Sequence, residues 1–411
     1  ATDTYNTGVG YNAGGLITTG TGNTFVGGLA GDAVTTSADN TAVGYQALTT
    51  STTAANNTAV GVSALKLTTT GANNTAVGRG ALLANTTGTP NTAVGFETLK
   101  SNTTGTNNTA LGSEALELNT TGIQNTAVGA LSLDANTTGN ENTAVGYGSL
   151  SSNTTAAGNT AVGWLAMTTT TTGYANVAMG LSALQAQTTG HQNVALGHQA
   201  LDALTTGSLN TAVGRAALGV NTIGVNNVAI GAFALDANTT ASNNVAVGYG
   251  TLGVNTTGTV NTALGHQALE KNTTASNNTA VGANALFKNT TGAGNTAVGD
   301  SAGDALTTGS SNVALGRLSL STEDTGRKNV AVGFAALETQ NSDVDNLNTA
   351  IGFYAGGAVT SGVQNTLIGG LAGDALTDAD ANVAVGYQAL TTDTLGSRSV
   401  AVGFSALRFQ A

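Results

Sequence analysis

The sequence predicts an all-β fold: a single rod-like parallel β-solenoid (β-roll) that takes up residues 1–411 as about 24 coils, each built from one 17-residue unit. Three observations support this. The asparagine before each "TAVG" or "VAVG" recurs in steps of 17 from Asn6 to Asn329, and after one step of 19 to Asn348 the step of 17 returns. Glycine stands four positions after that asparagine in every unit. A 17-residue unit is too short for a helix pair, and no helical periodicity accompanies it.

The sequence of each unit predicts one strand and one turn per coil. Numbered from its asparagine, the coil has the consensus N-[TV]-A-V-G-x-x-A-L-x-x-N-T-T-G-x-x. Coil positions 2–4 alternate and are rich in β-branched residues, which is typical of a short strand. The "NTTG" segment, as in residues 85–88, has the composition of a turn. With strands ~4.8 Å apart, the array would be about 115 Å long, interrupted by a two-residue insertion near residues 341–347.

The alternation leads us to expect coil positions 2, 4 and 9 inside the coil. Alanine at position 3 and glycine at position 5 would then face outward, as a second sheet face or, in the preferred interpretation, as a subunit interface. Five coils carry glycine in place of leucine at position 9, and all five have an apolar residue at position 12. This exchange predicts that positions 9 and 12 fill the same interior space. The expected core includes Val43, Leu48, Val60, Leu65, Val94, Leu99, Leu306 and Leu376.

Stacking of coils turns each coil position into a column of equivalent residues. We expect an amide ladder at position 1 and a hydroxyl ladder at position 13, with charged residues confined to variable positions such as 10 and 11, facing water. The expected ladder residues are Asn40, Asn57, Asn74, Asn91, Gly44, Gly61, Gly78, Thr86 and Thr103.

The repeated motif resembles a known family. "N-[TV]-A-V-G-x-x-A" is similar to the "S-V-A-I-G-x-x-A" head repeats of trimeric autotransporter adhesins, which form a left-handed parallel β-roll assembled as a trimer. The "NTAVGYQAL…NTTG" arrays also resemble repeats of phage tail-fibre and bacterial surface-fibre proteins. The resemblance covers essentially all 24 coils. It implies a lateral trimer and an extracellular location on a cell surface or virion, although the coil is longer than the usual adhesin head repeat and no stalk or anchor motif is present.

Composition narrows the classes of function. The net charge is −11 and no basic run occurs, so nucleic-acid binding is not expected. No apolar run approaches the ~20 residues needed to span a bilayer, so membrane insertion is not expected either. We expect a non-catalytic structural fibre or filament that self-associates and could also be adhesive, in a chain that is processed or a fragment. The array begins and ends in mid-coil, which favours neighbouring domains or end-to-end joining of chains. The alternatives are an ice-binding solenoid, because of the threonine columns, and, more remotely, a polysaccharide-acting β-helix enzyme.

The search for chemistry yields no catalytic, cofactor or metal site. His191, His198 and His266 lie at variable positions, and the acids at position 10 do not form a calcium-binding nonapeptide. The "NTT" sequences at Asn85 and Asn102 match the glycan acceptor pattern but are interpreted as turns. Coil position 6 varies and is often bulky, so it could contact a receptor or glycan, or pack between chains. The candidate contact residues are Tyr45, Phe96, Tyr147, Trp164, Tyr249 and Tyr387.

Overall fold

The computed structural model describes residues 4–409 and is an all-β parallel solenoid, with no helix among those residues. Each coil contributes one strand of three or four residues, centred on coil positions 2–4, as the alternation predicted. Successive strands lie one repeat unit apart along the chain. The fold class and the repeat period are therefore confirmed. The rest of each coil consists of turns and bends.

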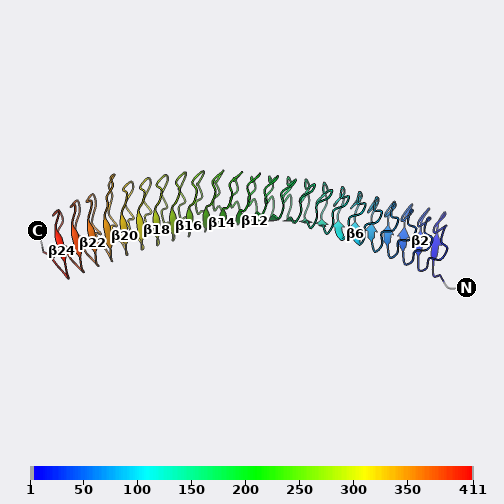
Figure 1. Cartoon of the computed structure of the whole chain (residues 1–411), viewed down its shortest axis with the longest axis horizontal. Coiled ribbons are helices and arrows are strands. Elements are labelled where there is room, and N and C mark those ends of the chain that lie inside the picture. Colours follow the sequence, from blue (N-terminus) through cyan, green and yellow to red (C-terminus); the bar gives the residue numbers. More distant parts are fainter. Residues whose placement is uncertain (1–3, 410–411) are drawn as a thin grey trace. The chain divides into compact units, whose positions relative to one another are not determined.

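The chain forms two compact units, residues 1–207 and 208–411. Within each unit the strands follow one another in chain order (Figure 1). The strands of the first unit are Thr7–Val9 (β1), Thr24–Val26 (β2), Thr41–Val43 (β3), Thr58–Val60 (β4), Thr75–Val77 (β5), Asn91–Val94 (β6), Asn108–Leu111 (β7), Thr126–Val128 (β8), Thr143–Val145 (β9), Thr160–Val162 (β10), Val177–Met179 (β11) and Val194–Leu196 (β12). Those of the second unit are Thr211–Val213 (β13), Val228–Ile230 (β14), Val245–Val247 (β15), Thr262–Leu264 (β16), Thr279–Val281 (β17), Thr296–Val298 (β18), Val313–Leu315 (β19), Val330–Val332 (β20), Thr349–Ile351 (β21), Thr366–Ile368 (β22), Val383–Val385 (β23) and Val400–Val402 (β24).

Neighbouring strands pair in parallel and in register with the repeat. Val43 of β3 lies opposite Val60 of β4, and Val60 lies opposite Val77 of β5. Where the insertion falls, Val332 of β20 still pairs with its equivalent, Ile351 of β21, despite the longer step between them. Main-chain bonds between coils continue beyond the strands, for example from the Leu48 amide to the Ala64 carbonyl at 3.0 Å. The two extra residues are therefore accommodated outside the ladder.

Glycine at coil position 5 is required by both conformation and stacking. At Gly95 the φ angle is +143°, which side-chain-bearing residues rarely adopt. A Cβ atom built there would lie 2.3 Å from the carbonyl oxygen of Gly112, one coil further on. Its neighbours Gly44, Gly61 and Gly78 show the same two constraints. This accounts for glycine at this position in every coil.

The strand side chains that point inward are those at position 3, and not those at positions 2 and 4 as the sequence suggested. The interior is therefore narrower than expected. Alanine at position 3, such as Ala42, is fully buried, whereas the valines at position 4 are only half-buried. The expectation that Val43, Val60 and Val94 belong to the core was wrong, and so was an outward alanine stripe. Leucine at position 9 fills most of the interior. The space that remains beside it, at position 3, has room only for the methyl group of alanine. The leucines expected in the core are all fully buried: Leu48, Leu65, Leu99, Leu306 and Leu376.

Positions 9 and 12 lie in the same interior, as predicted, although the exchange of volume is not strict, because Leu201 and Leu204 occupy both positions of one coil and are fully buried. A Cβ atom at Gly373, a position-9 glycine, would lie 2.9 Å from Cδ1 of Leu376 at position 12. It would also lie 2.7 Å from Cδ2 of Leu367, which replaces the usual alanine at position 3. Phe25 similarly fills the space beside Gly31. Positions 3, 9 and 12 therefore share one interior, and a large residue at one of them requires a small one at another.

The asparagine at position 1 holds each coil closed and joins it to the next. Its Oδ1 accepts the main-chain N–H of the following asparagine, as between Asn40 and Asn57 at 3.0 Å and between Asn57 and Asn74 at 2.9 Å. Its Nδ2 donates across the coil to the carbonyl at position 15, as from Asn74 to Gly88 at 3.0 Å. In many coils Nδ2 also donates to Oδ1 of the preceding asparagine, as from Asn40 to Asn23 at 3.1 Å and from Asn125 to Asn108 at 3.2 Å. The expected amide ladder is therefore present in these coils, beside the bonds to the main chain.

A second amide ladder runs along position 12 wherever successive coils carry asparagine there. Asn102 donates to Oδ1 of Asn85 at 2.9 Å, and Asn119 donates to Asn102 at 2.8 Å. Asn102 and Asn91 also converge on a single acceptor, the Gly105 carbonyl. These asparagines are fully or almost fully buried, and every such bond replaces one that water would otherwise make.

The threonine column at position 13 also bonds to the main chain. The Thr86 hydroxyl donates to the Thr103 carbonyl at 3.0 Å, and Thr103 donates to Thr120 at the same distance. The column is a ladder, as expected, but each rung runs from a hydroxyl to a carbonyl. The turn therefore gains one extra bond per coil.

Candidate functional site

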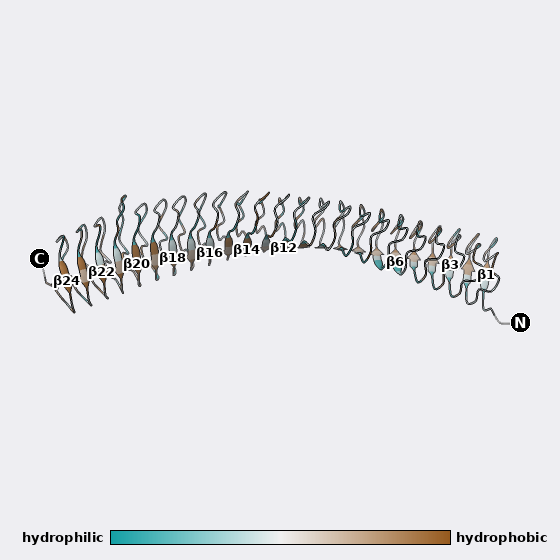
Figure 2. Cartoon of the chain, in the orientation of Figure 1, coloured by the Kyte–Doolittle hydropathy of each residue, from teal (hydrophilic) through white to brown (hydrophobic). Residues whose placement is uncertain are grey.

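The outer surface of the strands is the most extensive unusual feature of the molecule. We call it the strand face and define it by the side chains at coil positions 2 and 4 of β1–β24. Position 4 is Val, Leu, Ile or Met in all 24 strands. Leu111 and Met179 are each 47% exposed, and Leu264 is 46% exposed. Figure 2 shows the apolar character of the strands, most strongly at β14, β20 and β24.

Strand register makes this apolar surface continuous within each unit. The position-4 side chains lie opposite their equivalents, as with Val77, Val94 and Leu111. Position 2 is threonine in β1–β10 and threonine or valine in the later strands, and it is also partly exposed. Monomeric soluble proteins rarely expose one apolar patch larger than a few hundred Å². The strand face is therefore the first candidate for a functional surface.

The aromatic column at position 6 borders this face. Its candidate residues, Tyr45, Phe96, Tyr147, Trp164, Tyr249 and Tyr387, are between 40% and 54% exposed. Some rings of successive coils stack, as Phe334 does on Phe353 with centroids 5.5 Å apart and Tyr387 on Phe404 with centroids 5.7 Å apart. Arg79 lies over Phe96, with its guanidinium carbon 5.5 Å from the ring centroid. The side chains are thus available for contact, as the sequence suggested, and the role of ligand or inter-subunit contact stays a prediction.

Acids at position 10 are half-buried and are less solvated than expected. Desolvation raises the pKa of Asp134 to about 6. The same cause raises the pKa of Asp236 and of Asp374. Because the neighbouring coil lies about 4.8 Å away on each side, a short side chain in this column cannot reach full solvent.

The insertion is held by one buried carboxylate. Glu323, at position 12, accepts bonds from the Gly326 amide at 2.7 Å and from Asn346 Nδ2 at 2.9 Å. It also accepts the Ser342 amide at 3.3 Å. On the loop itself Asp345 lies 2.6 Å from Lys328 Nζ, and this bond lowers the pKa of Asp345. The charged groups of the insertion thus have structural partners.

Three further possibilities are a metal site, glycan attachment at the "NTT" asparagines and a membrane-spanning helix. No group of three or more His, Cys, Asp or Glu side chains among residues 4–409 is placed to hold a metal ion. Asn85, Asn102, Asn136 and Asn272 are fully buried, and their amides donate inside the coil, in agreement with their interpretation as turn residues. No helix in the described part of the chain has the length and apolar composition needed to cross a membrane.

The sequence pattern missed two features of these surfaces. The strand face was assigned to the interior because alternation gives the period but not the phase. The position-12 ladder was interpreted only as a turn, although asparagine recurs there from Asn85 to Asn153 and from Asn221 to Asn289. In comparisons with protein-family models and with curated proteins, the chain matches none.

Proposed function

We propose that the chain is a non-catalytic, self-associating segment of a structural fibre, in which the strand face is buried against further copies of the same chain. The observation that carries the proposal is the column at position 4. It is apolar in every strand, yet its side chains stay partly exposed. In an isolated chain no core requires this choice, and burial would contribute about 25 cal/mol per Å² of apolar surface.

The proposal includes an extracellular position, on a bacterial cell surface or a virion, and an adhesive role for the column at position 6. The support is the motif's resemblance to adhesin heads and tail fibres, together with six large aromatic side chains that are 40% to 54% exposed. Aromatic side chains are enriched among residues that dominate binding energy at interfaces. A lateral trimer and an end-to-end filament are the two assemblies that the resemblance and the array suggest.

The test replaces three registered valines with threonine: Val60, Val77 and Val94. Threonine has a similar shape and a high strand propensity, so the fold should persist while the apolar surface is reduced. We expect self-association to weaken at least tenfold, as measured by analytical ultracentrifugation and native mass spectrometry. The matched control places lysine at Thr70, Thr87 and Thr104, which are exposed at position 14 of the same coils, and should assemble normally.

Each outcome has a clear meaning. A wild-type chain that is monomeric at micromolar concentration would contradict the proposal. A discrete mass of three chains that is lost in the triple variant would favour lateral assembly through the strand face. Filaments of indefinite length in negative-stain micrographs that persist in the triple variant would favour end-to-end joining and contradict burial of the strand face. The ice-binding alternative predicts thermal hysteresis, which a fibre segment should lack.

A further inference from the structure

Position 10 carries a second pattern that fibre assembly does not explain. Glycine occupies this position in four coils, at Gly15, Gly219, Gly253 and Gly357. In each case the next coil carries an acid at the same position. The four acids are Asp32, Asp236, Glu270 and Asp374. A missing side chain in a stacked column leaves a gap, and here an acid always borders it.

Two of these gaps are open notches of about 220 Å³ each. They use equivalent coil positions. One is lined by Asn12, Gly15 and Leu16 at positions 7, 10 and 11, with Asp32 from the next coil. The other has Gly250, Gly253 and Val254 at the same three positions, with Glu270 from the next coil. The same kind of site has thus formed in two separate parts of the chain.

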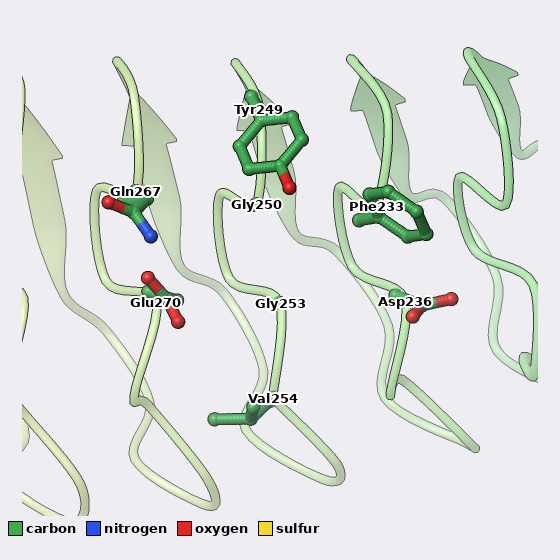
Figure 3. Close-up of a pocket in the computed structure, with 8 residues that line it drawn as sticks. All are labelled: Phe233, Asp236, Tyr249, Gly250, Gly253, Val254, Gln267 and Glu270. Carbon is green, nitrogen blue, oxygen red and sulfur yellow. The ribbon is translucent and has the colours of Figure 1, made fainter.

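The second of these, which we call the Gly253–Glu270 notch, is the better defined. Figure 3 shows bare main chain at Gly250 and Gly253, with Phe233 and Asp236 on one side and Gln267 and Glu270 on the other. The rings of Phe233 and Tyr249 meet edge to face, with centroids 5.9 Å apart. The notch therefore combines an apolar wall, a main-chain floor and a carboxylate.

The carboxylate at the notch has an unused acceptor. Oε1 of Glu270 lies 2.8 Å from Lys271 Nζ, but Oε2 is buried and has no hydrogen-bond partner. Oδ1 of Asp32 and Oδ1 of Asp374, the equivalent acids beside Gly15 and Gly357, are also buried without a partner. A buried acceptor of this kind costs free energy until a donor arrives. Asp134 and Asp304, which do not follow a glycine, have the same unpartnered oxygen, so the space left by the glycine is what distinguishes the notches. Three of the four sites combine that space with an unpartnered acceptor, which favours a cationic or hydrogen-bond-donating ligand.

The chain itself shows which cation fits such a place. In the coil that begins at Asn91, position 10 is Lys100 instead of glycine. Its Nζ lies 3.3 Å from Oε1 of Glu117, the position-10 acid of the next coil, and 2.7 Å from Oε2 of Glu97. Glu117 is the counterpart of Glu270. A lysine side chain thus occupies, in one coil, the space that is empty above Gly253 in another.

The rest of the notch suits the same group. Val254 and the edges of the Tyr249 and Phe233 rings offer an apolar surface for an alkyl stem. The Phe233 ring already takes one cation, because the Arg215 guanidinium carbon lies 5.3 Å from its centroid. A similar contact exists nearby, where Lys271 Nζ lies 5.6 Å from the Phe287 ring centroid. A metal ion fits less well, because no cluster of three ligating side chains occurs among residues 4–409.

We propose that the Gly253–Glu270 notch binds an alkylammonium group, such as a lysine side chain of a partner polypeptide. The ammonium lies at the carboxylate of Glu270, and the stem lies over Gly253 against Val254 and the two rings. The Gly15–Asp32 notch is a second site of the same kind, with a smaller apolar wall. This inference does not depend on self-association through the strand face.

The experiment uses NMR spectroscopy of the deuterated full-length chain. It follows the amide resonances of Gly250 and Gly253 during titration with Nα-acetyl-lysine methylamide, which keeps its ε-ammonium group. We expect saturable shifts at millimolar concentration, at least fivefold larger than those caused by N-acetyl-norleucine methylamide, which has a similar stem and no charge. A parallel titration with 1,5-diaminopentane distinguishes a free amine from a peptide side chain, because the better ligand should bind severalfold more tightly.

Two variants test the geometry. Glu270→Gln should reduce binding at Gly253 at least fivefold. Gly253→Lys should abolish it, because the new side chain would occupy the notch as Lys100 occupies its own coil, while the Gly15–Asp32 notch keeps responding. Glu338→Gln, a position-10 acid that does not follow a glycine, is the matched control and should bind normally. Equal shifts with the norleucine compound, or unchanged binding in Gly253→Lys with a normal circular dichroism spectrum, would overturn the proposal.

Discussion

Two stretches of the chain differ in how the buried side chains at position 12 make their hydrogen bonds. From Asn85 to Asn153 the column is asparagine in five successive coils, and each amide bonds to the next. Around the insertion the same column reads Glu323, Gln340 and Val359. In the first stretch each asparagine side chain bonds to the identical side chain of the next coil. In the second, each side chain differs from its neighbours and needs its own partners.

The irregular stretch shows what the column requires. Glu323 takes its donors from the inserted loop, and Oε1 of Gln340 accepts Asn348 Nδ2 at 2.7 Å. Val359 has no polar group and instead fills the space beside Gly356. The lesson is that the column tolerates any residue whose volume and hydrogen bonds are compensated nearby.

The largest expected effect is common to both stretches. Gly112→Ala in the regular stretch and Gly333→Ala beside the insertion should each destabilise the chain by about 3 kcal/mol or more, because a Cβ atom would meet the next coil's carbonyl oxygen at 2.5 Å and 2.3 Å respectively. Urea denaturation followed by circular dichroism measures this. A much smaller loss at Gly333 alone would show that stacking is already relaxed at the insertion.

The next effect separates the stretches by core volume. Leu116→Ala should cost about 2–5 kcal/mol, because the side chain is fully buried and leaves a cavity. Val359→Ala removes less volume from a coil that already has Gly356, so its cost should be smaller by at least ~1 kcal/mol. The same denaturation series compares the two variants, and equal costs would contradict the idea of a shared, exchangeable interior.

The third effect contrasts a rung of the ladder with the insertion carboxylate. Glu323→Ala should cost about 2–4 kcal/mol, since it leaves several donors without an acceptor, and Glu323→Gln should recover part of this. Asn119→Ala should cost about 1–3 kcal/mol. Hydrogen exchange of the Ser342 amide gives a local readout. Unchanged protection of that amide in Glu323→Ala would mean that the carboxylate does not hold the loop.

The smallest effect is a pH dependence in the regular stretch. Burial raises the pKa of Asp134 from 3.8 to about 6, so its protonated form is favoured in the folded chain. Its contribution to stability is therefore fully present below pH ~4 and lost as the pH rises through about 6. Asp134→Asn should flatten this part of the stability profile relative to the wild type. Profiles of the same slope between pH 4 and 6 would argue against the assignment.

The repeat made most of the architecture predictable. Period, strand positions, the glycine at position 5 and the buried Leu48 and Leu99 all follow from stacking one short unit on itself. The phase of the strand did not follow, because "TAV" alternates equally well with alanine or valine inside. Only the width of the interior decides, and the coils with Phe25 and Leu367 opposite glycines contained that information.

The candidate surfaces were less accessible to sequence reasoning. Tyr249 was singled out as an exposed aromatic, but its notch depends on two glycines, Gly250 and Gly253, within its own coil. Comparing each coil with the next would have revealed that a position-10 glycine always precedes an acid. A consensus sequence averages over all coils. A notch of this kind instead depends on two adjacent coils that both depart from the consensus, one with a glycine and the next with an acid.

The asparagine at position 1 has a consequence for how such a gene changes. Its bonds reach either 14 residues ahead within the coil or 17 residues back to the preceding asparagine. Loss or duplication of one whole unit therefore brings together two edges that already match, and no new contact has to evolve. A lineage could adjust the number of coils by unequal recombination, one whole repeat at a time, while every remaining turn keeps its neighbours.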